Sequence, residues 1–213
     1  EGVQPIMGCQ FALAHAAHDL VAEGYALFYR ARATVGSGRK AAGGGDAEDA
    51  LDLLTQADDT AGVASALFFC AIATQYSGDV ELACDLFARC AATYEKSGLP
   101  AGAARALQLL GIARLILGDL PVARAALEAG LPAIVDIGDR FAVPAGLTGM
   151  AGLAAKSDRP RLALRLAGAA AAYEKVNQTY LPDPLRGSLE EWLAPIRATL
   201  GVAAAKHFAE GRR

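Results

Sequence analysis

The amino-acid sequence predicts an all-α protein, an α-solenoid in which antiparallel pairs of helices are stacked. Two observations predict this class. Hydrophobic residues make up 54% of the chain and are mostly alanine, whereas aromatic residues contribute 7%; alanine is the best helix former and is depleted in strands. The sequence also repeats itself at an interval of forty residues, and a fixed interval of about 20–50 residues is typical of stacked helical repeats.

The repeat is clearest in two adjacent segments, residues 61–100 and 101–140, which align without a gap. AGVASAL begins the first copy and AGAARAL the second, and each copy carries a Gly-Asp pair near its middle, at Gly78–Asp79 and Gly118–Asp119. In the second copy, small and apolar residues recur every three to four residues on both sides of this pair, as one face of a helix requires. Each copy is therefore predicted to be two helices joined by a turn.

Three further segments complete the predicted organisation. Residues 141–180 form a third copy, with Asp158 in place of the glycine, and a degenerate copy covers about residues 11–60. Residues 181–213 are expected to form a pair of capping helices, since the end of a stack needs a covering element. We predict about ten helices in a single domain. We interpret the chain as part of a larger protein, because it starts with EGVQPIMG, without an initiator methionine or a signal peptide.

The Gly-Asp pair has a physical role in the predicted turn. Gly118 is expected to end the first helix in the left-handed conformation that glycine adopts at little cost. Asp119 is expected to cap the second helix by accepting hydrogen bonds from its free amide groups. Alanine recurs at positions 83, 123 and 163, where a larger side chain would force two crossing helices apart. We therefore expect Ala83, Ala123 and Ala163 to be nearly inaccessible.

Two prolines are predicted to mark helix boundaries. Pro132 lacks the amide hydrogen that a helix interior needs, so the helix that starts at Asp119 is expected to end or kink near residues 130–132. Asp183–Pro184 is expected to begin a capping helix, with the aspartate as its cap and the proline in its first turn. Trp192 is expected to anchor this helix on the last repeat, because its indole is large and largely apolar.

Composition narrows the classes of function. A net charge of −3 and a pI near 5.6 argue against a surface that contacts nucleic acid directly. No uninterrupted apolar run reaches the roughly 18 residues of a membrane span. Cys70, Cys84 and Cys90 fall within helical periodicity, so we expect buried free thiols and a cytoplasmic location rather than disulfides or a zinc site.

The spacing of small and apolar residues resembles the tetratricopeptide repeat (TPR). The interval here is forty residues rather than about 34, so the helices are expected to be longer than in the standard repeat. The resemblance implies a TPR-like right-handed superhelix. The residues at the characteristic positions of the second copy are Leu107, Leu110, Gly111, Gly118, Ala123 and Leu127.

The last third of the chain resembles the end of the helical-repeat domain of bacterial STAND-type transcription regulators, which include large ATP-binding LuxR-family and SARP-like proteins. The resemblance rests on GDR at 138–140, ALRLAGAAAAYEKV at 163–176 and LGVAAAKHFAEGRR at 200–213. It implies a regulatory domain that senses an effector or partner and controls self-assembly. ATP is implied only for an absent neighbouring domain. The alternative is a free-standing TPR scaffold or co-chaperone.

The sequence contains no phosphate-binding loop of the GxxxxGK[ST] type. Its nearest candidate, GSGRKAAGGG at 36–45, lacks the glycine-lysine-hydroxyl order and a preceding strand. We interpret this segment as a loop between two helices, with Asp46 capping the second helix. No cofactor is expected in this chain.

A group of titratable residues near the start of the chain is the other candidate for chemistry. His15 and His18 are expected to lie one turn apart, with Asp19 and Glu23 nearby, and such a group can bind zinc or act as a base. Surface histidines are common on amphipathic helices, and no further strong ligand is placed beside them. We expect neither a metal site nor an enzyme.

The predicted binding surface is the concave side of the solenoid, lined by the first helix of each unit. Arg105 would pair with a carboxylate and Phe68 would supply an apolar anchor for a protein, a peptide or a small effector. The alternative is that these positions are merely solvated or crowded. By the TPR resemblance, the candidates are Ser65, Phe68, Gln75, Arg105, Gln108, Leu115 and Thr148.

Overall fold

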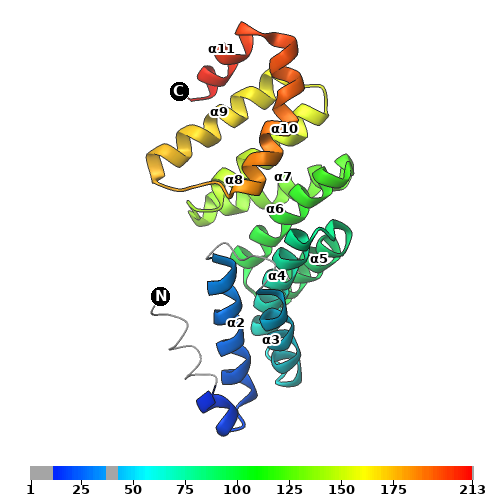
Figure 1. Cartoon of the computed structure of the whole chain (residues 1–213), viewed down its shortest axis with the longest axis vertical. Helices are drawn as coiled ribbons and strands as arrows, with labels where there is room; N and C mark the ends of the chain where they lie inside the picture. The colour runs from blue at the N-terminus through cyan, green and yellow to red at the C-terminus, as the bar shows by residue number, and fades with distance from the viewer. Residues whose placement is uncertain (1–11, 37–42, 213) are drawn as a thin grey trace. The chain divides into compact units, whose positions relative to one another are not determined.

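A computed structural model describes residues 12–36 and 43–212, and this part of the chain forms helices and no strand (Figure 1). The predicted all-α class is confirmed. A short helical segment precedes α2. The helices are α2 (Leu20–Gly36), α3 (Gly44–Gln56), α4 (Thr60–Ser77), α5 (Val80–Lys96), α6 (Pro100–Leu117), α7 (Leu120–Ile137), α8 (Val143–Lys156), α9 (Pro160–Asn177), α10 (Asp183–Leu200) and α11 (Val202–Gly211).

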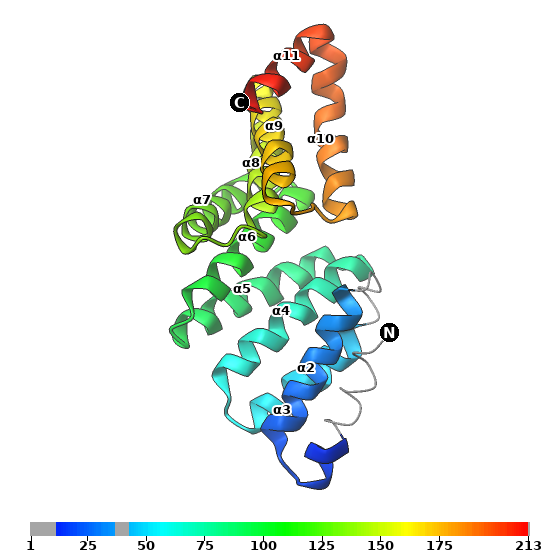
Figure 2. The same cartoon turned by 90° about the vertical axis from the view of Figure 1, so that its left-hand side faces the viewer.

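The chain divides into two compact units, and the boundary lies within α6, between Ala106 and Leu107. In the first unit, α2 packs on α3 and α4, α3 packs on α4, and α4 packs on α5 (Figure 2). Its core contains Leu27 and Phe28 of α2 together with Leu54 of α3, which is completely buried. Apolar faces of successive helices are therefore buried against one another.

In the second unit, α7 packs on α8, and α8 packs on α9 and α10. The last helix, α11, packs on α9. Leu115 of α6 and Leu127 of α7 share one apolar cluster with Leu153 of α8, and both Leu115 and Leu127 are completely buried.

Left-handed backbone conformations recur at a fixed interval along the chain. They occur at positions 58, 78, 98, 118, 138, 158 and 178, each twenty residues after the last. Asp158 has φ 53° where the aligned Gly78 and Gly118 have φ 99° and 83°. The turn that glycine makes in two copies is thus made by aspartate in the third, and aspartate tolerates this conformation better than most residues.

Aspartates cap three of the helices that follow these turns. The side chain of Asp59 accepts a hydrogen bond from the Gly62 amide at 2.9 Å, and Asp79 accepts one from the Leu82 amide at 3.0 Å. The predicted cap at Asp119 is also confirmed, with α7 as the capped helix. Such a cap stabilises a helix by about 1 kcal/mol.

The alanines expected at helix crossings are all completely inaccessible: Ala83, Ala123 and Ala163 are each 0% exposed. The crossing of α6 and α7 is tight at this point. A methyl group added at Gly111 would lie 2.6 Å from Cγ of Leu127 and 3.1 Å from the carbonyl oxygen of Ala123. The prediction of small residues at the crossing is confirmed in the middle copy by this close approach.

Two predicted helix boundaries differ from the structure. Helix α7 does not end near residues 130–132 but continues through Pro132 to Ile137; the alternative of a kink at the proline stays a prediction. Pro132 is exposed, so the carbonyl group that loses its amide partner to the proline lies on the solvent side, where water can satisfy it. Helix α10 begins one residue earlier than expected: Pro182 holds the cap position without a side-chain hydrogen bond, and Asp183, which was expected to be the cap, is the first residue of the helix.

The predicted role of Trp192 is confirmed. Its indole lies against Gly152 of α8 and occupies the space that any side chain at that position would need. Helix α10 packs on α8 accordingly. The indole thereby anchors the carboxyl-terminal helices to the first helix of the third copy.

One described helix, α6, is long and apolar enough to cross a membrane by length and composition alone, with a mean hydropathy of 1.2. Half of it is buried inside the structure, and packing against neighbouring helices accounts for apolar residues on that half. Arg105 and Arg114 interrupt its apolar sequence.

Candidate functional site

The first unit contains a pocket of about 280 Å³, which we call the aromatic pocket. Four helices contribute to it: α2, α4, α5 and the first turns of α6. Its size is near the lower end of the range for small-molecule sites, about 300–1,000 Å³. It is lined by Phe28, Arg32, Phe68, Phe69, Tyr94, Ala101, Gly102 and Arg105.

The apolar wall of the aromatic pocket is a chain of stacked rings. Phe28 of α2 meets Phe69 of α4 edge to face, with ring centroids 5.5 Å apart. Phe69 meets Phe68 at 5.6 Å, and Phe68 meets Phe87 of α5 at 6.2 Å, both near perpendicular. Phe87 is completely buried. Edge-to-face contacts stabilise aromatic pairs beyond the burial of their area, so this wall is held in place by the core behind it.

Tyr94 forms the polar part of the wall. Its hydroxyl donates a hydrogen bond to Oγ of Ser65 at 3.2 Å, and the Ser65 hydroxyl donates in turn to the carbonyl oxygen of Ala61 at 3.0 Å. Burial raises the pKa of Tyr94 above its ordinary value, so the phenol stays neutral. Gly102 makes room for the ring, since a methyl group there would lie 2.5 Å from Cδ1 of Tyr94.

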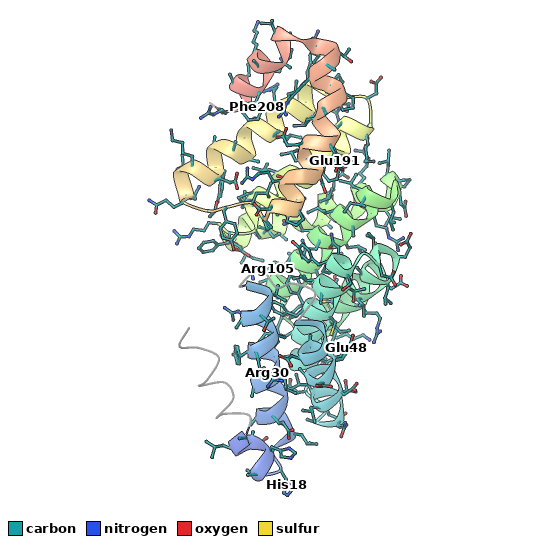
Figure 3. All side chains as sticks on the ribbon, viewed as in Figure 1. His18, Arg30, Glu48, Arg105, Glu191 and Phe208 are labelled. Carbon is teal, nitrogen blue, oxygen red and sulfur yellow. The ribbon has the colours of Figure 1, made fainter. Side chains whose placement is uncertain are left out.

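Two guanidinium groups supply the charge of the aromatic pocket. Arg32 and Arg105 are both exposed, and Figure 3 labels Arg105 on α6. None of the described residues that line the pocket is acidic, although the whole chain carries a net charge of −3. Guanidinium groups remain protonated at all physiological pH values.

Arg30, two residues before Arg32 on α2, has a different role. Its Nε donates to Oδ2 of Asp46 at 2.7 Å, and its Nη2 donates to Oδ1 at 2.6 Å. This bidentate pair joins α2 to the first turn of α3. The expectation that Asp46 caps α3 is wrong, because Gly43 holds the cap position and makes no side-chain hydrogen bond. The Asp46 carboxylate instead accepts hydrogen bonds from Arg30, which is labelled in Figure 3.

Of the residues predicted from the sequence, the structure brings Phe68 and Arg105 together in the aromatic pocket, and Ser65 adjoins it through Tyr94. Gln75 is partly exposed on α4 and does not line the pocket.

The other three predicted residues lie in the second unit and are buried. Gln108 is 2% exposed, and Leu115 and Thr148 are 0% exposed. Gln108 donates from Nε2 to the carbonyl oxygen of Ala142 at 3.0 Å. These residues are core positions in this structure and do not line an open surface.

Four large side chains that line the pocket were missed by sequence reasoning: Phe28, Arg32, Phe69 and Tyr94. The concave-surface rule considers only the first helix of each aligned copy, whereas Tyr94 lies on a second helix and Arg32 lies before the aligned copies. The available signal was the density of aromatic residues in YALFYRAR and ALFF, which is unusual in a chain this rich in alanine.

The titratable residues near the start of the described chain do not converge. Nδ1 of His15 lies 3.0 Å from Oε1 of Glu23. His18 is exposed in a left-handed turn with φ 51°, and Asp19 caps α2 by accepting from the Ala22 amide at 3.0 Å. The His18 amide donates a hydrogen bond to the His15 carbonyl oxygen at 3.2 Å, so the expected one-turn spacing of the two histidines is confirmed. No group of three or more metal-ligating side chains occurs in residues 12–36 and 43–212.

The expected free thiols are confirmed at Cys70, Cys84 and Cys90, all of which are buried. Burial raises the pKa of Cys70 and of Cys90 to about 12 in each case. Because the thiolate is the nucleophilic form, these two side chains are chemically inert at neutral pH.

Residues 37–42 of the GSGRKAAGGG segment lie outside the described residues. In comparisons with known proteins, no protein-family model and no curated protein matches this chain.

Proposed function

We propose that this chain is a TPR-like effector-binding domain of a bacterial STAND-type transcription regulator. Its helix pairs stack in a right-handed superhelix, it binds a small effector, and it thereby controls self-assembly of the regulator in the cytoplasm. The domain is non-catalytic and needs no cofactor of its own, since ATP belongs to a neighbouring domain. It contacts neither DNA nor a membrane directly.

Two observations support the repeat architecture of this proposal. The left-handed turns fall every twenty residues from position 58 to position 178, and a two-helix unit of forty residues accounts for that interval. Asp79 and Asp119 cap equivalent helices in two copies. The regulator itself is proposed from the resemblance of the segments at 138–140, 163–176 and 200–213.

The observation that carries the effector-binding function is the aromatic pocket. A concave site with apolar walls and a few convergent polar groups is the usual form of a small-molecule site. A ligand seated there would contact α2, α4, α5 and α6 at once. Because each helix pair in a solenoid contacts only its neighbours, such a ligand would favour one arrangement of these helices over others and so shift a population of conformations. That is the physical basis proposed for regulation.

A thermal-shift screen of the chain against small metabolites tests the proposal. A ligand at one hundred times its Kd stabilises the folded state by about 2.7 kcal/mol, which raises the melting temperature measurably. Phe68→Ala should abolish the shift. The matched control is Phe141→Ala, because Phe141 is 61% exposed and lies outside the pocket. Sedimentation velocity with and without the ligand then reports self-assembly.

Arg32→Gln is a second variant for the same screen, because Arg32 is exposed and lines the pocket; it should reduce the shift caused by a ligand that contacts the guanidinium group. If no metabolite stabilises the chain, or if Phe68→Ala and Phe141→Ala respond alike, the proposed effector-binding function is wrong.

A free-standing TPR scaffold remains the second candidate function, favoured by one observation. Phe68 and Gln75 are seven residues apart on α4, hence two turns along one face, and both are partly exposed. An extended peptide would contact both side chains. Gln75→Ala would then weaken peptide binding, whereas it would leave binding of a small effector in the aromatic pocket unchanged.

A further inference from the structure

We infer that the aromatic pocket binds a small uncharged aromatic molecule of one or two rings. The inference rests on the proposed effector-binding function and names the chemical class of the effector. Four of the eight residues that line the pocket carry aromatic rings, in a chain whose aromatic residues contribute only 7%. The pocket therefore concentrates a kind of side chain that the rest of the sequence rarely uses. The four rings are those of Phe28, Phe68, Phe69 and Tyr94.

Part of the ring surface in the pocket is open to solvent. Phe68, Phe69 and Tyr94 are each partly exposed, and all three line the same pocket. A ligand that displaces water from this surface gains free energy from the burial of apolar area. An apolar body is therefore the main requirement for the ligand.

The arrangement of these rings selects an aromatic body over a saturated one. The rings of Phe28 and Phe69 meet edge to face at 73° with centroids 5.5 Å apart, and those of Phe68 and Phe69 do so at 77° and 5.6 Å. Aromatic rings prefer such contacts at about 4.5–7 Å, because the positive edge of one ring meets the negative face of the other. A ligand ring can continue this series, which strengthens binding about fivefold beyond the burial of area.

The wall of the pocket is held in position by its own contacts. The ring of Phe68 packs on the completely buried ring of Phe87, with centroids 6.2 Å apart. The Tyr94 hydroxyl donates to Ser65, and the Tyr94 ring lies so close to Gly102 that a methyl group there would be 2.5 Å from Cδ1. A wall that is already ordered reduces the entropy cost of binding. Because the Tyr94 hydroxyl is engaged, Tyr94 offers the ligand its ring.

The charges around the pocket favour a neutral ligand. None of its described lining residues is acidic, so a cation would find no carboxylate to offset its lost hydration. Arg105 already interacts within the chain, and Arg32 is exposed, where water and salt screen its charge. An anion therefore finds no buried partner among the described lining residues either. The guanidinium group of Arg32 can instead lie over the face of an aromatic ligand.

The size of the pocket limits the ligand to a small molecule. A volume of about 280 Å³ lies near the lower end of the range for small-molecule sites, about 300–1,000 Å³, and accommodates one or two rings with a small polar group. A peptide could insert only an aromatic side chain, and the ordering of its flexible backbone would cost entropy. A free ring compound is therefore expected to bind more tightly than a peptide.

Amide chemical-shift titrations of the full chain with matched probes test this assignment. The probes are benzamide, cyclohexanecarboxamide, benzoate, benzamidinium and the tripeptide Gly-Phe-Gly. The first four have nearly the same size and differ in ring type or in charge. We expect benzamide to bind about fivefold more tightly than cyclohexanecarboxamide, although the saturated ring has more apolar surface and burial alone would favour it. Benzoate, benzamidinium and the tripeptide should bind more weakly than benzamide.

Substitution of single rings by leucine separates ring contacts from apolar burial. Phe68→Leu and Phe69→Leu should each weaken benzamide about fivefold and leave cyclohexanecarboxamide nearly unchanged, because leucine is apolar but has no ring. The control is Phe141→Leu, which should change neither affinity, because Phe141 is 61% exposed and does not line the pocket. A thermal melt checks that each variant is folded, and the comparison among probes on the unaltered chain does not depend on the variants.

Three results would overturn the assignment. Equal or tighter binding of cyclohexanecarboxamide would show that the pocket does not select aromatic rings. Tighter binding of benzoate or benzamidinium would show that it selects charge, and tighter binding of the tripeptide would identify a peptide as the occupant. Equal effects of Phe141→Leu and Phe69→Leu on benzamide would show that the ligand binds outside the pocket.

The failure of this inference is distinguishable from the failure of the proposed function. If benzamide does not bind but another metabolite class raises the melting temperature in a way that depends on Phe68, the ligand class is wrong and effector binding stands. If no class does so, both are wrong.

Discussion

Helices α4 and α8 are equivalent in the aligned sequence, yet α4 lines a pocket whereas α8 is closely packed against its neighbours. Phe68 and Phe69 of α4 stand at the positions that Thr148 and Gly149 hold eighty residues later in α8. Two rings in the first unit form the wall of an open pocket. In the second unit, Thr148 is completely buried, and a methyl group at Gly149 would lie 2.7 Å from Cδ2 of Leu127.

Close packing extends along α8. Gly146 and Gly152 also lie on it, and neither has room for a side chain: a methyl group at Gly146 would lie 2.6 Å from Cδ1 of Leu131, and Trp192 fills the space at Gly152. Small residues let helices approach closely and close their interface, whereas Phe68 and Phe69 line the aromatic pocket in the first unit. One repeat pattern thus produces a pocket in one unit and a closed core in the other.

The largest expected effect is from Ala123→Leu, which adds three carbon atoms to the crossing of α6 and α7. Ala123 is 0% exposed and Gly111 faces its carbonyl oxygen. We expect a loss of about 3 kcal/mol in the free energy of unfolding, measured by urea denaturation. Ala125→Leu is the control, because Ala125 is an exposed alanine of the same helix. Equal stability of the two variants would mean that the shared alanine reflects composition and not a packing constraint.

Gly152→Ala should have the next largest effect, because the added methyl group collides with the indole of Trp192. We expect a loss of about 1–2 kcal/mol from overpacking, seen as a lower melting temperature. Gly187→Ala on α10 adds the same methyl group to a helical position where nothing lies within 4 Å. That control should gain about 0.5–1 kcal/mol from helix propensity. Two changes of the same sign would contradict the closed interface of α8.

Asp119→Ala should cost about 1 kcal/mol, because α7 loses the hydrogen bond that caps its amino terminus. The comparison is Asp136→Ala, an exposed aspartate near the carboxyl end of the same helix, where removal of a negative charge is neutral or slightly favourable. Chemical denaturation of both variants measures the difference. A loss in Asp136→Ala as large as that in Asp119→Ala would show that the cap contributes nothing specific.

Thr148→Val should have the smallest effect. The Thr148 hydroxyl oxygen is among the buried described atoms that have no hydrogen-bond partner, and valine has nearly the same shape. Replacing an unpaired buried hydroxyl by a methyl group is expected to leave the melting temperature unchanged or to raise it slightly. Thr93→Val is the comparison, since the exposed Thr93 hydroxyl donates to the Arg89 carbonyl oxygen. A clear loss of stability only in Thr148→Val would contradict this description of the core.

Local features of the fold could be predicted from the sequence, because they depend on neighbouring residues in the chain. Gly118 ends a helix through its left-handed backbone conformation, Asp119 caps the next helix through its side chain, and the buried Ala123 follows from the repeat. The course of α7 through Pro132 could not be predicted, since it depends on which side of the helix faces solvent. The Arg30–Asp46 pair likewise joins two helices whose contact no local pattern reveals.

The candidate site could be predicted only in part for the same reason. Phe68 and Arg105 were found because both lie on first helices of aligned copies. Arg32 comes from the degenerate copy and Tyr94 from a second helix, so only the packing of α2, α4 and α5 brings them to the same pocket. Gln108 shares its aligned position with Phe68 and is nevertheless buried, because its neighbours in the second unit close around it.

The most direct test of the account is an amide chemical-shift map of the chain titrated with the metabolite that stabilises it most in the thermal-shift screen. The account predicts that perturbed amides cluster on the residues that line the aromatic pocket, including Ala101 and Gly102 at the start of α6, and that the same titration leaves Gly149 and Gly152 of α8 unchanged. Perturbations centred on α8, or none at saturating ligand, would contradict the proposal that the aromatic pocket is the binding site.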